Sequence, residues 1–402
     1  MKLGLVPKII IGIILGTLIG QYMPTEVCRL VVTLSGIFSN FLKFVIPMMI
    51  LAYVTMGIAD LTQGAGKLLL ITALLAYGST LIGGTFSFFV ADNLFPSFIS
   101  SNVTEQLSKV AGVTLEPFFS ISIPPILDTI SAVVLAFILG LSLSALKGKT
   151  IGDTLYGTVK DFSGIIDAVL THAIIPFLPL YVCGTFVDMT KSGKTFVILG
   201  VLWKVFLVVI AMHFILLFVQ FMVAGTIGHK NPFMLMKNQV PGYTTALGTQ
   251  SSAATIPVNK EACDNIGVPK DVSDLVLPMG CTMHMDGSVL SSIVKIAFLY
   301  GVFGKDFVGA ETYAMAIVVA ILSAFVLSGA PGGGLVGEML IVSMFNFPAE
   351  AFPIIATLGF IFDPAATCLN SSGDTIASMI VTRLVEGKDW LVKAVAAKKE
   401  TA

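Results

Sequence analysis

Apolar residues along the chain fall into long runs typical of helices that cross a membrane. Six such runs occupy the first part of the sequence, at about 7–23, 31–59, 66–95, 123–146, 161–187 and 195–227. At 1.5 Å of rise per residue, runs of this length approach or exceed the ~30 Å hydrocarbon thickness of a bilayer. The pattern therefore predicts an all-α polytopic membrane protein.

The remaining apolar segments are shorter and interrupted. The segment 241–258 is too short and too polar to span alone, a helix is broken at 282–288, and 325–340 has a Gly/Pro break at its middle. Paired interrupted segments are typical of re-entrant hairpins, and irregular backbone at membrane depth has to be buried in protein or line a cavity. With a last helix at about 351–386, we predict eight transmembrane helices plus two re-entrant helical hairpins.

The last predicted helix has a polar face made of Asp363, Thr367, Asn370 and Asp374. The steps of four, three and four residues place all four side chains within roughly 60° of one another around the helix. A carboxylate at the bilayer centre costs roughly 3 kcal/mol on insertion scales. This face is therefore expected to adjoin an ion, a charged substrate or a water-filled cavity.

Three further motifs interrupt the apolar pattern: TQSSAATIP at 249–257, HMDGS at 284–288 and SGAPGGG at 328–334. The first offers hydroxyl and N–H groups to a carboxylate, or is a small-residue helix contact. In the second, an aspartate beside a glycine suits a cation such as Na⁺, which prefers hard oxygens. In the third, Pro and Gly prevent a continuous helix and favour a hairpin tip that acts as a gate.

Two ionisable residues near these motifs have open interpretations. His284 is either a satisfied core histidine or a group that takes part in proton coupling. Glu338 either extends towards the membrane surface or pairs with His284 or Lys295.

Composition narrows the function. The chain is 55% hydrophobic and 12% charged, about half the charge of a soluble protein, and its net charge of −1 gives no reason to expect a nucleic-acid partner. Its five cysteines have no paired spacing, and no nucleophile–base set or metal cluster indicates an enzyme. Lysines cluster in alternate connections and in the tail, which places both termini in the cytoplasm.

Four motifs follow one another along the chain: the serine-rich tip, the Met-Asp-Gly break, the Gly/Pro-rich tip and the Asp…Thr…Asn…Gly-Asp helix. Their order and spacing resemble those of the dicarboxylate/amino-acid:cation symporter family, the glutamate-transporter-like proteins. The resemblance covers essentially the whole chain. It implies a homotrimer with an elevator mechanism, in which a transport domain moves against a static scaffold. The implied scaffold comprises 1–65 and 96–194, and the implied transport domain comprises 66–95 and 195–402.

The resemblance also implies functional residues. Asp363 is expected to hold the substrate amino group and Asn370 its carboxylate. The implied substrate-binding residues are Gln250, Ser251, Ser252, Ala330, Gly332, Asp363, Ala366, Thr367 and Asn370. The implied ligands of co-transported Na⁺, at three sites, are Tyr77, Thr80, Gly280, Thr282, His284, Met285, Asp286, Ser323, Ala324, Val326, Asn370 and Asp374. No organic cofactor is expected.

Departures from the family pattern concern the substrate and the ions. Acidic-substrate members have an arginine at one of the positions that here are Gln250 and Ala366, so a second substrate carboxylate would lack a partner. His284 stands where the family usually has an asparagine that serves the third Na⁺, and Leu81 replaces a hydroxyl residue of that site. Ser292 stands at the proton-carrying glutamate position. The pattern predicts a small neutral amino acid as substrate, with two or three Na⁺ per cycle.

The sequence therefore predicts a Na⁺-coupled symporter for a Ser/Thr/Ala-like amino acid in a prokaryotic inner membrane. Two alternatives remain open at this point. One is the same fold carrying cystine or a dicarboxylate, and the other is an ion channel or a proton-coupled carrier that uses His284 and Glu338.

The missing arginine gives a direct test. Ala366→Arg is expected to shift preference from serine towards aspartate, because a guanidinium would pair with the second carboxylate. Competition of unlabelled aspartate against labelled serine uptake measures the shift. No gain for aspartate would contradict the assignment of Ala366 to the side-chain pocket.

Overall fold

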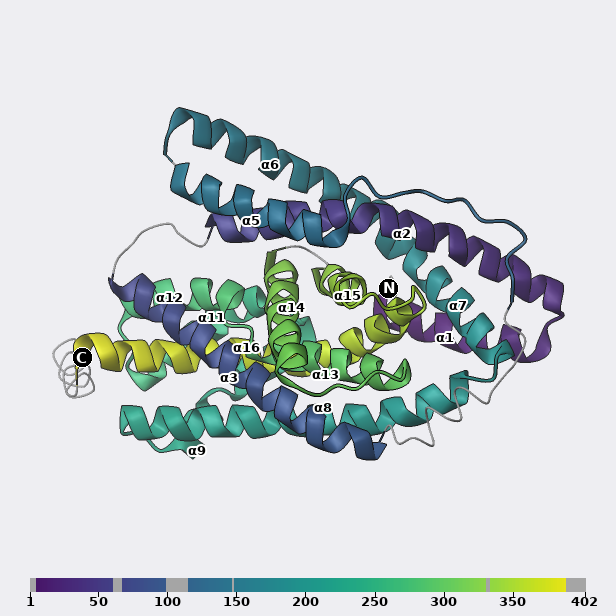
Figure 1. The fold of residues 1–402 in the computed structure, drawn as a ribbon. Helices are drawn as coiled ribbons and strands as arrows, with labels where there is room; N and C mark the ends of the chain where they lie inside the picture. The colour runs from purple at the N-terminus through teal and green to yellow at the C-terminus, as the bar shows by residue number, and fades with distance from the viewer. Residues whose placement is uncertain (1–4, 61–66, 99–114, 147, 330–332, 388–402) are drawn as a thin grey trace. The chain divides into compact units, whose positions relative to one another are not determined.

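The computed structural model describes residues 5–60, 67–98, 115–146, 148–329 and 333–387, and every regular element in these ranges is helical. Figure 1 shows the course of the chain. The elements are α1 (Leu5–Tyr22), α2 (Thr25–Asp60), α3 (Lys67–Phe98), α5 (Thr129–Leu146), α6 (Thr150–Val169), the π-helical turn η1 (Leu170–Ile174), α7 (Ile175–Lys191), α8 (Thr195–Gly228), α9 (Pro232–Asn238), α10 (Val240–Thr249), α11 (Ser252–Ile266), α12 (Lys270–Met283), α13 (Asp286–Val302), α14 (Ala310–Gly329), α15 (Gly333–Met344) and α16 (Ala351–Glu386).

Seven helical stretches within the described residues are long and apolar enough to cross a membrane. They are Thr25–Ala59, Leu70–Phe95, Thr129–Leu146, Thr150–Lys191, Thr195–Gly228, Lys270–Val302 and Ala351–Glu386. The prediction of an all-helical, polytopic membrane protein is thereby confirmed. Helix α1 is a shorter apolar helix over Pro7–Tyr22, so an eighth full span stays a prediction, as do the re-entrant hairpins.

The helix boundaries differ most from the sequence prediction where polar turns flank the apolar runs. Helix α5 begins at Thr129, after Pro124 and Pro125, and Asp128 accepts hydrogen bonds from the backbone and side chain of Ser131. These bonds lower the pKa of the Asp128 carboxyl, since they favour its charged form. Helix α6 begins at Thr150, before the start at 161 that the apolar run predicts. Its first turns are amphipathic, and hydrophobicity alone does not predict such turns.

The predicted interruptions in the second half are confirmed where the structure describes them. Helices α10 and α11 meet at Gln250, which adopts the left-handed conformation with φ of 52°. Helices α12 and α13 are separated at His284, whose φ of −94° and ψ of 89° end α12. The tip between α14 and α15 at 330–332 lies outside the described residues.

The helices pack into two units, each formed by three stretches of the chain. Unit 1 comprises Met1–Gln63, Ala91–Val205 and Lys295–Phe360, and unit 2 comprises Gly64–Val90, Phe206–Val294 and Ile361–Ala402. This grouping by packing differs from the predicted scaffold and transport domains, which are defined by motion and stay a prediction.

Within unit 1, α1 packs against α7 through three glycines spaced four residues apart. A Cβ at Gly12 would lie 2.6 Å from the Pro179 carbonyl oxygen, one at Gly16 would lie 2.9 Å from Phe186 Cβ, and one at Gly20 would lie 2.6 Å from Thr190 Cβ. Small residues let helix backbones approach closely in membranes, where packing rather than hydrophobicity drives association. This spacing therefore fixes how α1 docks on α7.

Gly16→Ala is expected to lower the thermal unfolding temperature in detergent, because the added methyl forces α1 away from α7. Gly36→Ala in α2 is the matched control, since a methyl added at Gly36 would meet nothing within 4 Å. The control should be neutral or slightly stabilising, as alanine favours helix by about 1 kcal/mol over glycine. Equal unfolding temperatures for the two variants would contradict the close docking.

Candidate functional site: carboxylates joined by a buried histidine

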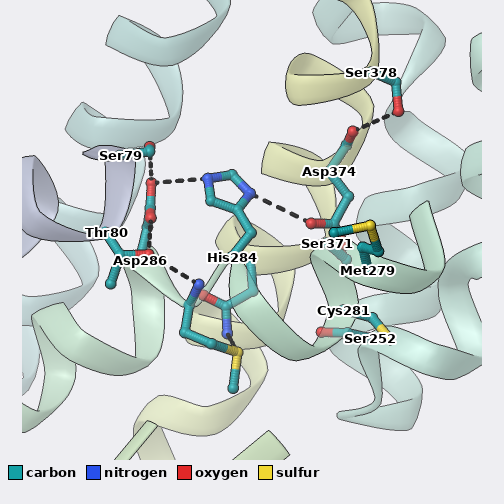
Figure 2. Close-up of polar contacts among 12 residues, drawn as sticks. Ser79, Thr80, Ser252, Met279, Cys281, His284, Asp286, Ser371, Asp374 and Ser378 are labelled. Atoms are coloured by element: carbon teal, nitrogen blue, oxygen red, sulfur yellow. Dashed lines mark hydrogen bonds and ion pairs between the residues drawn. The ribbon is translucent and has the colours of Figure 1, made fainter. Parts of the chain in front are cut away.

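The break between α12 and α13 brings polar side chains together inside unit 2 (Figure 2). His284 ends α12 with its N–H donating to the Gly280 carbonyl at 2.8 Å, and Asp286 begins α13 two residues later. Because the chain leaves helical geometry here, both side chains project into the same buried region. Helix α16 contributes Asp374 from the predicted polar face.

The His284 imidazole lies between two carboxylates. Its Nε2 is 3.2 Å from Asp286 Oδ2, and its Nδ1 is 3.3 Å from Asp374 Oδ1. His284 is 3% exposed, Asp286 0% and Asp374 2%. A carboxylate ion only accepts hydrogen bonds, so a ring that donates to two ionised carboxylates uses both nitrogens and carries a positive charge. The three groups thus form a buried cluster of ionisable side chains.

Asp286 has three further donors. Ser79 donates to Oδ2, Gln220 Nε2 donates to Oδ2 at 2.5 Å, and Thr80 Oγ1 donates to Oδ1 at 2.9 Å. The Thr80 hydroxyl in turn accepts the backbone N–H of Met285 at 3.2 Å. Side chains of α3 and α8 are therefore hydrogen-bonded to the start of α13 through this one carboxylate.

Asn370 ties the polar face of α16 to the same break. Its Oδ1 accepts the backbone N–H of Gly287 at 2.7 Å and that of Ser288 at 3.4 Å, and its Nδ2 donates to Ser288 Oγ at 2.8 Å. Gly287 is needed here, since a Cβ would come within 2.7 Å of the Ala366 Cα. The side-chain amide thus satisfies backbone groups that the start of α13 leaves open.

Two other glycines make room for the charged cluster. A Cβ at Gly373 would lie 2.6 Å from His284 Nδ1, and one at Gly280 would lie 2.6 Å from Asp374 Cγ. The ring and the carboxylate occupy the space that side chains at these two positions would need. The cluster is therefore built into the packing of α12 against α16.

The structure brings several of the predicted site residues together within unit 2. Joined by contacts at the break are Thr80, Gly280, His284, Met285, Asp286, Ala366, Asn370 and Asp374. At the α10–α11 junction, Gln250 is exposed and Ser251 accepts the Ala254 N–H at 3.3 Å as the N-cap of α11. Thr282 is exposed and donates to the Met279 carbonyl.

The other predicted residues are spread over several helices. Tyr77 is on α3, Ser252 begins α11, and Asp363 and Thr367 are on α16. Ser323, Ala324 and Val326 are buried in unit 1 on α14, and the predicted residues Ala330 and Gly332 lie outside the described residues. The substrate and ion roles of all these residues stay predictions.

Sequence reasoning missed Ser79, Gln220 and Ser288. Gln220 had a usable signal, because a lone amide in the most apolar helix needs a polar partner. Ser79 and Ser288 gave no such signal, since isolated serines are common in membrane helices.

Glu338 pairs with Lys295, one of the alternatives that the sequence left open. Lys295 Nζ is 3.1 Å from Glu338 Oε1, and the side chains are 7% and 3% exposed. Both residues belong to unit 1, where the pair links α13 to α15. A buried charge without a partner is strongly penalised, so the two charges are retained together.

An all-helical, polytopic chain whose broken helices meet at buried carboxylates has the features of a cation-coupled secondary transporter. The Sodium:dicarboxylate symporter family matches residues 5–384, and the chain belongs to that family. It is therefore a transporter and not an enzyme, as the sequence predicted.

The chain is also similar to individual transporters. It is 28% identical over 395 residues, covering 94% of this chain and 96% of the relative, to the serine/threonine transporter SstT of Acinetobacter baumannii strain AYE. The transporters of the same name from strains AB307-0294 and AB0057 match with the same identity and coverage.

The Lys295–Glu338 pair can be tested by a mutant cycle. Lys295→Met alone is expected to cost about 3–5 kcal/mol of stability, because Glu338 would stay buried without the Lys295 ammonium group. The double variant Lys295→Met/Glu338→Leu should recover most of that loss. Denaturation in detergent measures both, and a double variant no more stable than the single one would contradict the pairing.

Proposed function

We propose that this protein is a secondary active symporter that couples inward Na⁺ flow to uptake of a small neutral amino acid of the serine, threonine or alanine type. The observation that carries the substrate class is the pair Gln250 and Ala366, which stand where acidic-substrate members of the family have an arginine. A second substrate carboxylate would have no cation to meet it, at a large desolvation cost. The serine/threonine transporters to which the chain is similar support the same class.

In this proposal the polar face of α16 binds the substrate. Asp363 holds the amino group, and Thr367 and Asn370 lie one and two turns further along the helix. The serine-rich N-terminus of α11 contributes N–H and hydroxyl groups to the carboxylate, aided by the helix dipole. The amide of Asn370 also bonds to Gly287 and Ser288, so substrate binding is coupled to the α12–α13 break.

Na⁺ supplies the driving force. Asp374 and the carbonyls near Gly280 form one proposed ion site, and Thr282 and Met285 contribute to another. A carboxylate plus exposed carbonyls offers the hard oxygens that such an ion prefers. We further propose a homotrimer in a prokaryotic inner membrane, with both termini cytoplasmic, an elevator-type transport domain and the 325–340 hairpin as its gate.

The alternatives make distinct predictions. A carrier of cystine or of a dicarboxylate would be competed by those compounds, and Asp363 argues against a substrate without an amino group. A proton-coupled carrier that uses Glu338 is disfavoured by the ion pair of this residue with Lys295. A channel would give single-channel conductance.

Uptake into proteoliposomes tests the function. Labelled serine should accumulate under an inward Na⁺ gradient and not under an equal choline gradient, and excess succinate should leave uptake unchanged. Serine uptake indifferent to Na⁺ would overturn the coupling, and inhibition by succinate but not by threonine or alanine would overturn the substrate class.

The two carboxylates of α16 should separate in function. Asp363→Asn is expected to lower serine binding at least tenfold, because the carboxylate that holds the substrate amino group is lost. Asp374→Asn should mainly raise the Na⁺ concentration needed for half-maximal uptake, because the carboxylate that binds Na⁺ is lost. Asp92→Asn in α3 is the control, with both parameters expected at the unchanged level. Identical effects of the two α16 variants would contradict the division of roles.

A further inference from the structure

We propose, on the basis of the function proposed above, that His284 takes the place of one co-transported Na⁺. Its imidazole is a built-in cation between Asp286 and Asp374, so Asp286 and Thr80 hold no Na⁺. Transport then uses one ion fewer than the three that the family resemblance implies, and His284 sets the number of Na⁺ bound.

The first argument is the crowding of donors at one oxygen of Asp286. Each carboxylate oxygen has about two lone-pair positions. Three donors face Oδ2, from Ser79, Gln220 and His284, and Thr80 donates to Oδ1. A Na⁺ at Oδ2 would have to displace protein donors in a site that is 0% exposed.

The second argument is the chemistry of these partners. Gln220 and His284 present N–H groups to Asp286, and an N–H repels a cation. The hydroxyl of Thr80 donates to Asp286 and accepts the Met285 N–H, so its oxygen already has a donor.

The third argument is position. The ring lies between Asp286 and Asp374 in a region with almost no exposure to solvent, with Nε2 3.2 Å from Asp286 Oδ2 and Nδ1 3.3 Å from Asp374 Oδ1. A cation between two buried carboxylates would have to stand where the ring stands, and unpaired buried charge is costly.

The fourth argument is space. The ring fills the volume in front of Gly373, where a Cβ would lie 2.6 Å from Nδ1. Asparagine at position 284 lacks the reach to contact both carboxylates, so His284→Asn opens this volume and leaves side-chain oxygens around it.

The test counts Na⁺ on the purified protein in detergent by equilibrium dialysis with ²²Na⁺, without added amino acid. Wild type is expected to bind about two Na⁺ at saturation, and His284→Asn one more. His284→Lys, which restores a cation, should return to the wild-type number. His213→Asn is the matched control, since this buried histidine contacts the Val209 and Gly287 carbonyls and Ser291, none of them a carboxylate.

An unchanged number in His284→Asn, or three Na⁺ on wild type, would overturn the proposal, and the wild-type count decides even where the variant fails to fold. Absence of Na⁺ binding to both proteins would overturn it as well. Because the count needs no transport, a protein that gains a Na⁺ on His284→Asn but takes up no serine would refute the proposed substrate and leave this inference standing.

Discussion

The contact on which the rest of unit 2 depends is the imidazole of His284 held between the carboxylates of Asp286 and Asp374. It joins the end of α12, the start of α13 and the middle of α16 through contacts of 3.2 and 3.3 Å. Asp286 extends the network to α3 and α8 through Thr80 and Gln220. A helix that is broken in an apolar environment leaves backbone groups without partners. These side chains compensate for that break.

Most of the fold could be predicted from the sequence, because long apolar runs in a chain with 12% charged residues have few alternatives to membrane helices. The last helix was predicted at its observed limits, and the breaks at Gln250 and His284 were placed by Ser-, Gly- and Asp-rich motifs. The first turns of α6 were missed because they are amphipathic, and hydrophobicity does not register a half-polar helix.

The site could be predicted only in part. The polar face of α16 and Asp286 were found because carboxylates in apolar helices are costly and conspicuous. The bridging position of His284 could not be found, since it depends on where α16 passes relative to α12, which no local pattern encodes. The same holds for Ser79 and Gln220, whose meeting at Asp286 joins residues more than 130 positions apart in the sequence.

The packing at Gly373 constrains the order in which substitutions at positions 284 and 373 can occur during evolution. The His284 ring occupies the space in front of Gly373, where a larger side chain would collide with it. A chain that acquired the histidine first, with any other residue at 373, would have met a steric clash in its core. The glycine had to precede the histidine, or arise with it, so the order of these two mutational steps is constrained by packing alone.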